Sequence, residues 1–166
     1  MSVVRARRAV PDDSAAIAGI YNQCIQERTA TFETRPRDGS EIVRWFDGRH
    51  PIVVAEAEGR VVGFASTSTY RDRDCYSGIA EFSVYVSSSS RGKGTGTLLM
   101  GELISESRRA GFWKLVSRVF VDNAASRAML RTLRFREVGI YEKHGRLDGV
   151  WRDVVIVELL IADRYD

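Results

Sequence analysis

The segment of this chain with the most chemical content is glycine-rich, and it reads SSSSRGKGTGT over residues 87–97. Gly92, Gly94 and Gly96 leave the backbone open to a ligand, and glycine tolerates positive φ. The segment follows a strand-like run, EFSVYV, and precedes a helix-like run over residues 98–110. The first amides of a helix lack partners, and the helix dipole favours negative charge there. This order of elements therefore predicts a phosphate-binding loop.

The glycine spacing distinguishes between phosphate ligands. A dinucleotide fingerprint needs G-x-G-x-x-G, and a P-loop needs G-x-x-x-x-G-K-[ST]. Here the glycines follow G-x-G-x-G with Lys93 between them, so neither pattern fits. The pattern that remains is R-x-x-G-x-G, formed by Arg91, Gly94 and Gly96. It resembles the acetyl-CoA pyrophosphate motif of the GNAT N-acetyltransferase superfamily.

A second element strengthens this resemblance. Residues 123–135 read NAASRAMLRTLRF, which is similar to the N-x-x-[AS]-x-x-[LM]-x-x-x-[LG]-x-F helix of the same superfamily. The resemblance implies acetyl-CoA as co-substrate and no metal. The residues it implies for acetyl-CoA are the backbone of Val84, Tyr85 and Val86, the loop residues Arg91, Gly92, Lys93, Gly94, Thr95, Gly96 and Thr97, and the helix residues Asn123, Ser126 and Thr132.

Acetyl transfer to an amine requires a group that accepts the amine proton and donors that stabilise the carbonyl oxygen. Glu81 lies on the strand that leads into the glycine-rich loop. A carboxylate there, partly desolvated by Phe82 and Tyr76, is a suitable general base. From the residues alone, the alternative is a solvated glutamate at a strand edge that pairs with an arginine.

A narrower resemblance concerns the acceptor. Residues 70–76, YRDRDCY, and 80–86, AEFSVYV, resemble the phosphinothricin, methionine sulfoximine and arsinothricin N-acetyltransferases, and the likeness covers nearly the whole chain. It implies Glu81 as the base and an amino acid analogue as acceptor, in a detoxification or resistance role. It also implies a homodimer. The substrate-binding residues it implies are Phe32, Arg71, Arg73 and Tyr76. Guanidinium groups suit a phosphinate, arsinate or carboxylate because they bind oxyanions bidentately.

Two positions depart from the family pattern. Leu130 stands where many members have a tyrosine that protonates the leaving thiolate. A CoA thiol has a pKa near that of cysteine, about 8.5, so it can leave as a thiolate without that help. Because Leu130 cannot donate a proton, we expect acid catalysis to be lost but activity to remain. The second departure is Arg134, which replaces the usual glycine of the L-G-F turn.

The elements that must position these residues follow from hydrophobic periodicity and turn signals. We expect a single α/β domain over residues 1–166, with a mixed, largely antiparallel sheet flanked by helices. A helix starting near Ser14 should bury one stripe, and Asp38 or Ser40 should cap a short helix. Strands are predicted at residues 3–8, 52–57, 61–68, 79–86, 115–121, 138–144 and 151–161. Two later helices are predicted at residues 98–110 and 124–132. The first of these should bury a core stripe of Leu98, Leu99, Leu103 and Ile104.

Composition excludes several classes of protein. Of the 166 residues, 44% are hydrophobic and 28% charged, as in a globular protein. No apolar run is long enough for a membrane span, and the N-terminus resembles no secretory signal. The net charge of +3 and the absence of a basic stripe argue against a nucleic-acid partner. The two cysteines, Cys24 and Cys75, indicate neither a disulfide scaffold nor a zinc site, and a reducing cytoplasm fits them.

Two other functions remain open from the sequence. A protein N-terminal or polyamine acetyltransferase would share the fold, but it would favour a peptide groove or an acidic pocket, whereas Arg71 and Arg73 favour an anionic substrate. A CoA-binding sensor without catalysis would not need a carboxylate such as Glu81 beside the thioester.

Overall fold

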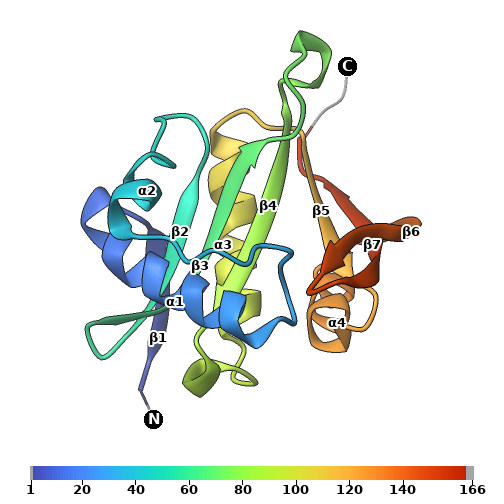
Figure 1. The fold of residues 1–166 in the computed structure, drawn as a ribbon. Coiled ribbons are helices and arrows are strands. Elements are labelled where there is room, and N and C mark those ends of the chain that lie inside the picture. The colour runs from blue at the N-terminus through green and yellow to red at the C-terminus, as the bar shows by residue number, and fades with distance from the viewer. Residues whose placement is uncertain (1, 164–166) are drawn as a thin grey trace.

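Residues 2–163 are described in the computed structural model, and seven of their segments form the strands of one sheet (Figure 1). These are β1 (Val4–Arg8), β2 (Ile52–Ala57), β3 (Arg60–Thr69), β4 (Ile79–Val86), β5 (Lys114–Phe120), β6 (Arg136–Leu147) and β7 (Val150–Leu160). Their order across the sheet is β1-β2-β3-β4-β5-β7-β6. Every neighbouring pair is antiparallel except β4 and β5, which are parallel. The predicted mixed, largely antiparallel sheet is confirmed.

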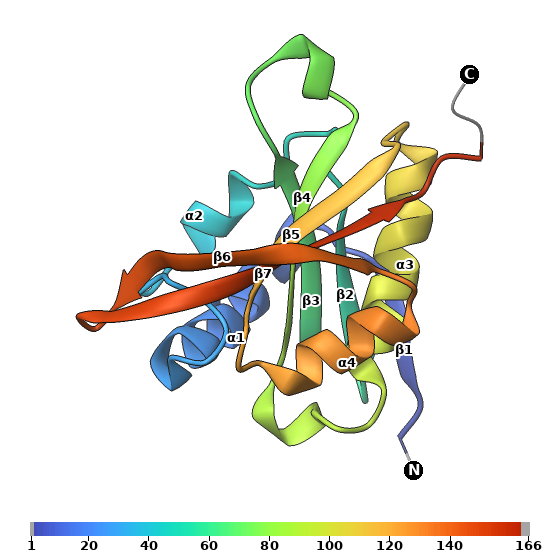
Figure 2. The same cartoon turned by 90° about the vertical axis from the view of Figure 1, so that its right-hand side faces the viewer.

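Helices cover both faces of the sheet, as Figure 2 shows with α1 and α2 on one side and α3 on the other. The α-helices of residues 2–163 are α1 (Ser14–Glu27), α2 (Gly39–Val43), α3 (Thr95–Arg109) and α4 (Ala124–Thr132). The predicted α1 stripe is confirmed, because Ile17, Ile20, Tyr21, Cys24 and Ile25 are all buried. Asp38 caps α2 by accepting a hydrogen bond from the Glu41 amide at 3.0 Å. None of these helices is both long and apolar enough to cross a membrane.

Three details of the predicted elements were wrong. α3 begins at Thr95 rather than at residue 98, because Gly94 adopts a left-handed conformation and serves as the N-cap. Leu98 is 40% exposed, while Met100 takes its place in the core, since the buried face of α3 runs through Leu99 and Leu103. β6 is longer than predicted and β7 begins and ends one residue earlier, because a two-residue Asp148-Gly149 turn with positive φ at both positions joins them.

The parting of β4 and β5 shapes the centre of the molecule. The two strands pair only where Ile79–Glu81 lies beside Lys114–Val116. Beyond that point they diverge, as Figure 1 shows. The residues of β4 after Glu81 therefore have a strand partner on the β3 side only. This gap opens toward the glycine-rich loop at the end of β4.

Candidate active site

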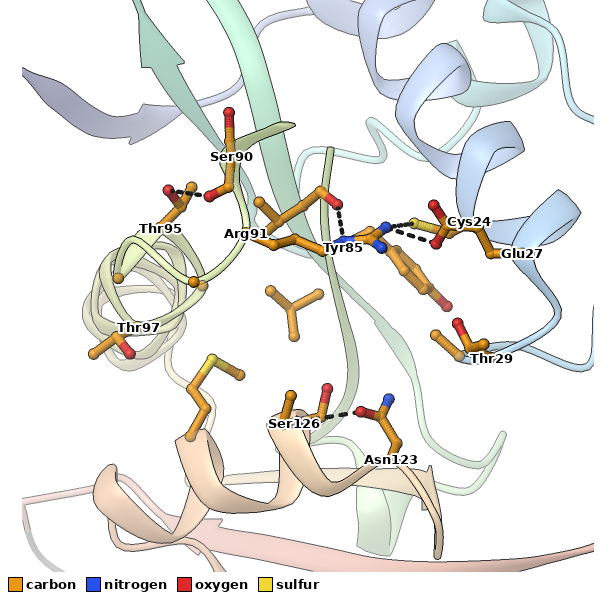
Figure 3. Close-up of a pocket in the computed structure, with 18 residues that line it drawn as sticks. Cys24, Glu27, Thr29, Tyr85, Ser90, Arg91, Thr95, Thr97, Asn123 and Ser126 are labelled. Atoms are coloured by element: carbon orange, nitrogen blue, oxygen red, sulfur yellow. Dashed lines mark hydrogen bonds and ion pairs between the residues drawn. The ribbon is translucent and has the colours of Figure 1, made fainter. Parts of the chain in front are cut away.

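A cavity of about 380 Å³ lies beside the glycine-rich loop, and we call it the α3–α4 cavity because both helix N-termini line it (Figure 3). Most of the residues that the sequence predicted for acetyl-CoA line this cavity. They are Val84, Tyr85, Val86, Arg91, Gly92, Gly94, Thr95, Gly96, Thr97, Asn123 and Ser126. The other two predicted residues do not line it. The Lys93 ammonium donates to the Ser89 carbonyl at 2.9 Å, and the Thr132 hydroxyl donates to the Ala128 carbonyl at 3.1 Å.

The loop has the conformation that an anion-binding site requires. Gly92 and Gly94 have φ values of 70° and 81°, in the left-handed region where glycine is favoured. The Leu98 amide donates to the Gly94 carbonyl at 3.0 Å, in the first hydrogen bond of the α3 ladder. The amides of residues 95–97 precede that bond and line the cavity. They can therefore donate to an anionic ligand at the positive end of the helix dipole.

Arg91 lies across the cavity from α4 and reaches α1 (Figure 3). Its Nε donates to the Val86 carbonyl at 2.9 Å, and its Nη2 lies 2.8 Å from the Glu27 carboxylate. Burial is the largest single influence on the pKa of Arg91 and lowers it, but the hydrogen bond to Glu27, the charge of Glu27 and the contact with Cys24 together raise the pKa above its ordinary value. The same Nη2 lies 3.6 Å from Cys24 Sγ, and burial raises the pKa of that thiol. Because Glu27 balances Arg91, the backbone amides are the main attraction for an anion here.

Asn123 caps α4, since its side-chain oxygen accepts a hydrogen bond from the Ser126 amide at 3.2 Å. The cap fixes the carboxamide at the cavity wall, where its Nδ2 can donate to a ligand. Asn123 thus supports both the helix and the cavity surface.

A smaller cavity, of about 50 Å³, occupies the gap between β4 and β5, and we call it the strand-gap cavity. It shares Ala30, Val84, Tyr85, Asn123 and Ser126 with the α3–α4 cavity, so the two cavities adjoin. Leu130 forms part of its wall and is 1% exposed. The residue that replaces the usual tyrosine thus presents only a hydrocarbon surface to this gap.

A third cavity, of about 560 Å³, lies on the face of the sheet that α1 and α2 cover, and we call it the α1–α2 cavity. Its floor carries the hydroxyls of Ser66, Ser68 and Ser83, and Tyr85 joins it to the other two cavities. Its walls include Tyr21, Glu33, Arg37, Arg44, Trp45, Asp47 and His50. This cavity could not be predicted from the sequence, because its walls come from segments far apart in the chain.

Both tyrosines of the α1–α2 cavity remain neutral at ordinary pH. Burial is the main cause that raises the pKa of Tyr21 and of Tyr85. Their hydroxyls are therefore hydrogen-bonding groups rather than charges.

Glu81 lines none of the three cavities itself, but its neighbours in the sheet do. It is opposite Ser68 in the β3–β4 register and two positions before Ser83, so it shares their face of the sheet. Ser83 lines both the α1–α2 cavity and the strand-gap cavity. The carboxylate of Glu81 is bonded to Arg118 of β5, which lines the strand-gap cavity, and its side chain is 25% exposed. The pairing with an arginine, the alternative that the sequence left open, is therefore present.

The predicted acceptor residues lie elsewhere. Arg71, Arg73 and Tyr76 are on the loop between β3 and β4, which projects past the end of the sheet (Figure 1), and none of them lines the three cavities. The guanidinium groups of Arg71 and Arg73 lie 5.3 Å and 5.8 Å from the ring centres of Tyr70 and Tyr76. Phe32 packs edge-to-face on Phe120 at 4.8 Å, beneath the β6–β7 hairpin.

Comparisons with known proteins agree with this architecture. Residues 20–135 match the acetyltransferase (GNAT) family. An L-methionine sulfoximine/L-methionine sulfone acetyltransferase of Pseudomonas paraeruginosa is 36% identical, over 89% of this chain and 88% of that protein. The L-amino acid N-acyltransferase MnaT of Escherichia coli is 33% identical, over 99% and 96%. The structure of yncA from Salmonella typhimurium, solved with its cofactor acetyl-CoA, superposes with a TM-score of 0.92 at 31% identity, covering 98% of this chain and 96% of that one.

Proposed function

This chain belongs to the acetyltransferase (GNAT) family, and we propose that it transfers the acetyl group of acetyl-CoA to the amine of a small amino acid analogue. Methionine sulfoximine, methionine sulfone, phosphinothricin and arsinothricin are the acceptors we propose, in a detoxification role. The observation that carries this proposal is that three neighbouring cavities share Tyr85 of β4 as a wall, and that Glu81 lies on the same strand two positions before Ser83, which lines two of them. The names of its relatives support the same class of acceptor.

Acetyl-CoA would occupy the two adjoining cavities. Its pyrophosphate would bind the amides at the start of α3, and Asn123 would donate to its pantetheine arm. The arm would then follow β4 into the strand-gap cavity. The Phe82 carbonyl points into this gap, since it accepts a hydrogen bond from the Ser117 hydroxyl of β5 at 2.7 Å. Because backbone groups alternate along a strand, the N–H and C=O of Val84 face the gap too and can bind the arm and the thioester oxygen.

The chemistry needs acceptors for two protons, because a free amino acid arrives as an ammonium ion. The ammonium gives one proton to Glu81, and the resulting amine attacks the carbonyl carbon of the thioester, forming a C–N bond. The second proton on the nitrogen then passes to water. The resulting oxyanion is stabilised by the free amide on the open edge of β4. Collapse of the intermediate breaks the C–S bond and releases CoA as a thiolate, for which Leu130 offers no proton. The products are the N-acetyl compound and CoA.

A thiol-release assay with acetyl-CoA and each proposed acceptor tests this function. We expect Glu81→Gln to lower kcat by about 10²–10⁴, the usual effect of removing a general base. Glu102→Gln is the matched control, since Glu102 lies on α3 and lines none of the three cavities. A Glu81→Gln variant within about twofold of the wild-type rate would show that another group takes the proton.

The loop carrying Arg71, Arg73 and Tyr76, together with Phe32, is proposed to recognise the oxyanionic head group. Replacing Arg71 or Arg73 by alanine should raise KM for the amine while leaving KM for acetyl-CoA unchanged. If a variant with both arginines replaced by alanine keeps the wild-type KM for the amine, the alternative function as a protein N-terminal or polyamine acetyltransferase is favoured.

We also propose a cytoplasmic homodimer. β6 is an edge strand, and Ile140, Tyr141, Val150 and Trp151 on the β6–β7 hairpin are each about half exposed. An apolar surface of this kind is typical of a protein interface. Light scattering should give about twice the chain mass of 18.7 kDa, and a value near 18.7 kDa would contradict the dimer.

A further inference from the structure

Arg118 is one of two cations on β5, whose sequence is KLVSRVF from Lys114 to Phe120. Its guanidinium is bonded through Nη2 to the carboxylate of Glu81. The side chain is 48% exposed and forms part of the wall of the strand-gap cavity. Arg118 is therefore positioned to contact a molecule that approaches Glu81.

The chemistry of the proposed acceptor places a negative charge at this point. In an α-amino acid the amine and the carboxylate are attached to the same carbon. If Glu81 accepts the amine proton, the amine must come within about 2.6–3.2 Å of its carboxylate. The acceptor's carboxylate is then forced close to Glu81 as well. Two carboxylates in one site repel each other unless a cation lies between them.

Arg118 is the cation bonded to Glu81, the proposed base, whereas other cations near the cavities are bonded to other carboxylates or line another wall. The guanidinium of Arg37 pairs with Glu33 at 2.8 Å, and Lys114 pairs with Glu158. Arg44 lines the α1–α2 cavity from the α2 side, where it is suited to the distal part of an acceptor. A guanidinium carries five N–H donors, so the bond to Glu81 leaves several for a second carboxylate.

We propose that Arg118 binds the α-carboxylate of the acceptor while Glu81 binds its amine, so that this ion pair recognises the two charges of a free amino acid. The inference rests on the proposed function and specifies which amines the enzyme acetylates. The acceptor must carry a free α-carboxylate next to its amine, which peptide-linked and decarboxylated amines lack.

The test compares two acceptors that differ only at the carboxylate, methionine sulfone and its α-carboxamide. Wild-type enzyme should prefer the free acid in kcat/KM by about 10- to 100-fold, the usual value of a charge-assisted hydrogen bond. Arg118→Ala should abolish that preference by slowing reaction with the acid while affecting the amide little. Arg118→Lys should restore part of it, because lysine keeps the charge but lacks the planar fork.

A purely positioning role for Arg118 predicts a different result, because loss of Glu81 orientation would slow both acceptors equally and preserve the preference. That outcome would overturn the inference, as would a wild-type enzyme without any preference. Arg44→Ala is the matched control and should keep the preference. If Arg44→Ala abolishes it instead, the carboxylate binds at the other side of the cavity.

Binding of the two acceptors to the CoA-loaded protein, measured by calorimetry, makes the same comparison without turnover. The proposed function fails if no acceptor yields product. This inference fails if acid and amide bind equally to wild type or if Arg118→Ala leaves their ratio unchanged. KM for acetyl-CoA and the melting temperature of Arg118→Ala, compared with wild type, establish whether the fold and the cofactor site are intact.

Discussion

Arg134 occupies a backbone position that normally belongs to glycine, and replacing it should stabilise the protein. The residue follows α4 with φ of 68°. The Phe135 amide donates to the Leu130 carbonyl at 3.0 Å, and the Arg134 amide donates to the Arg131 carbonyl at 2.9 Å. These two bonds form a Schellman motif, whose left-handed position is most often glycine. The geometry explains why the family pattern has glycine here and why arginine is strained.

The expected magnitude follows from this conformation. A non-glycine residue in the left-handed region is disfavoured by about 1–2 kcal/mol, while the greater freedom of glycine in the unfolded chain offsets part of the gain. Arg134→Ala removes the same exposed side chain and the same charge but keeps the strained backbone. Arg134→Gly should therefore be more stable than Arg134→Ala by about 1 kcal/mol, or roughly 2–4 °C in Tm for a chain of this length.

Urea and thermal unfolding of the two variants measure this difference. Arg28 provides a contrast, since it is also left-handed, with φ of 57°. Its guanidinium bonds to Asp148 at 2.9 Å and to the Ile25 carbonyl at 2.8 Å, so Arg28→Gly loses contacts that offset the relief. The reasoning is refuted if Arg134→Ala is as stable as Arg134→Gly, because backbone strain would then not determine stability at this turn.

Three further outcomes are expected. Gly94→Val should raise KM for acetyl-CoA at least tenfold, about 1.4 kcal/mol, because valine disfavours the left-handed N-cap; an unchanged KM in a folded variant would contradict a cofactor site at this loop. The hydrogen bonds from Arg7 lower the pKa of Asp13 in the folded protein. The stability that this pair contributes at neutral pH should therefore be lost as pH falls below about 4, the pKa of aspartate in the unfolded chain. Asp13→Asn should flatten that dependence in urea titrations, and an equally steep loss would exclude Asp13 as its source. Leu130→Tyr should leave kcat within about tenfold, and a larger gain would mean that thiolate departure limits the rate.

The cofactor loop could be predicted from the sequence because its chemistry is local. The spacing of Arg91, Gly94 and Gly96 and the strand and helix on either side all lie within one short segment. The helix boundary was less predictable, since Thr95 serves both as loop residue and as first residue of α3. Residues such as Lys93 and Thr132 were included by family position, and the structure directs their side chains to nearby backbone carbonyls instead.

The walls contributed by α1 could not be predicted in the same way. Cys24 and Glu27 meet Arg91 only because α1 packs across the sheet beside the end of β4. The helical period identifies the buried face of α1, but it does not indicate which distant loop the end of that face will touch. The α1–α2 cavity is likewise a product of tertiary packing, since Tyr21 of α1 and Trp45, which follows α2, meet there on one face of the sheet.

Arg118 is different, because the sequence carried a signal that was not used. β5 carries two charges, Lys114 and Arg118, and its parallel pairing with β4 brings Glu81 beside Arg118. From the sequence, an arginine partner and a catalytic role for Glu81 were alternatives. They are compatible, since a partly exposed ion pair contributes at most about 1 kcal/mol. Glu81 can therefore bind an incoming ammonium in addition to Arg118 without loss of the fold. The same weak pairing leaves Arg118 free to turn toward a carboxylate that arrives with that ammonium.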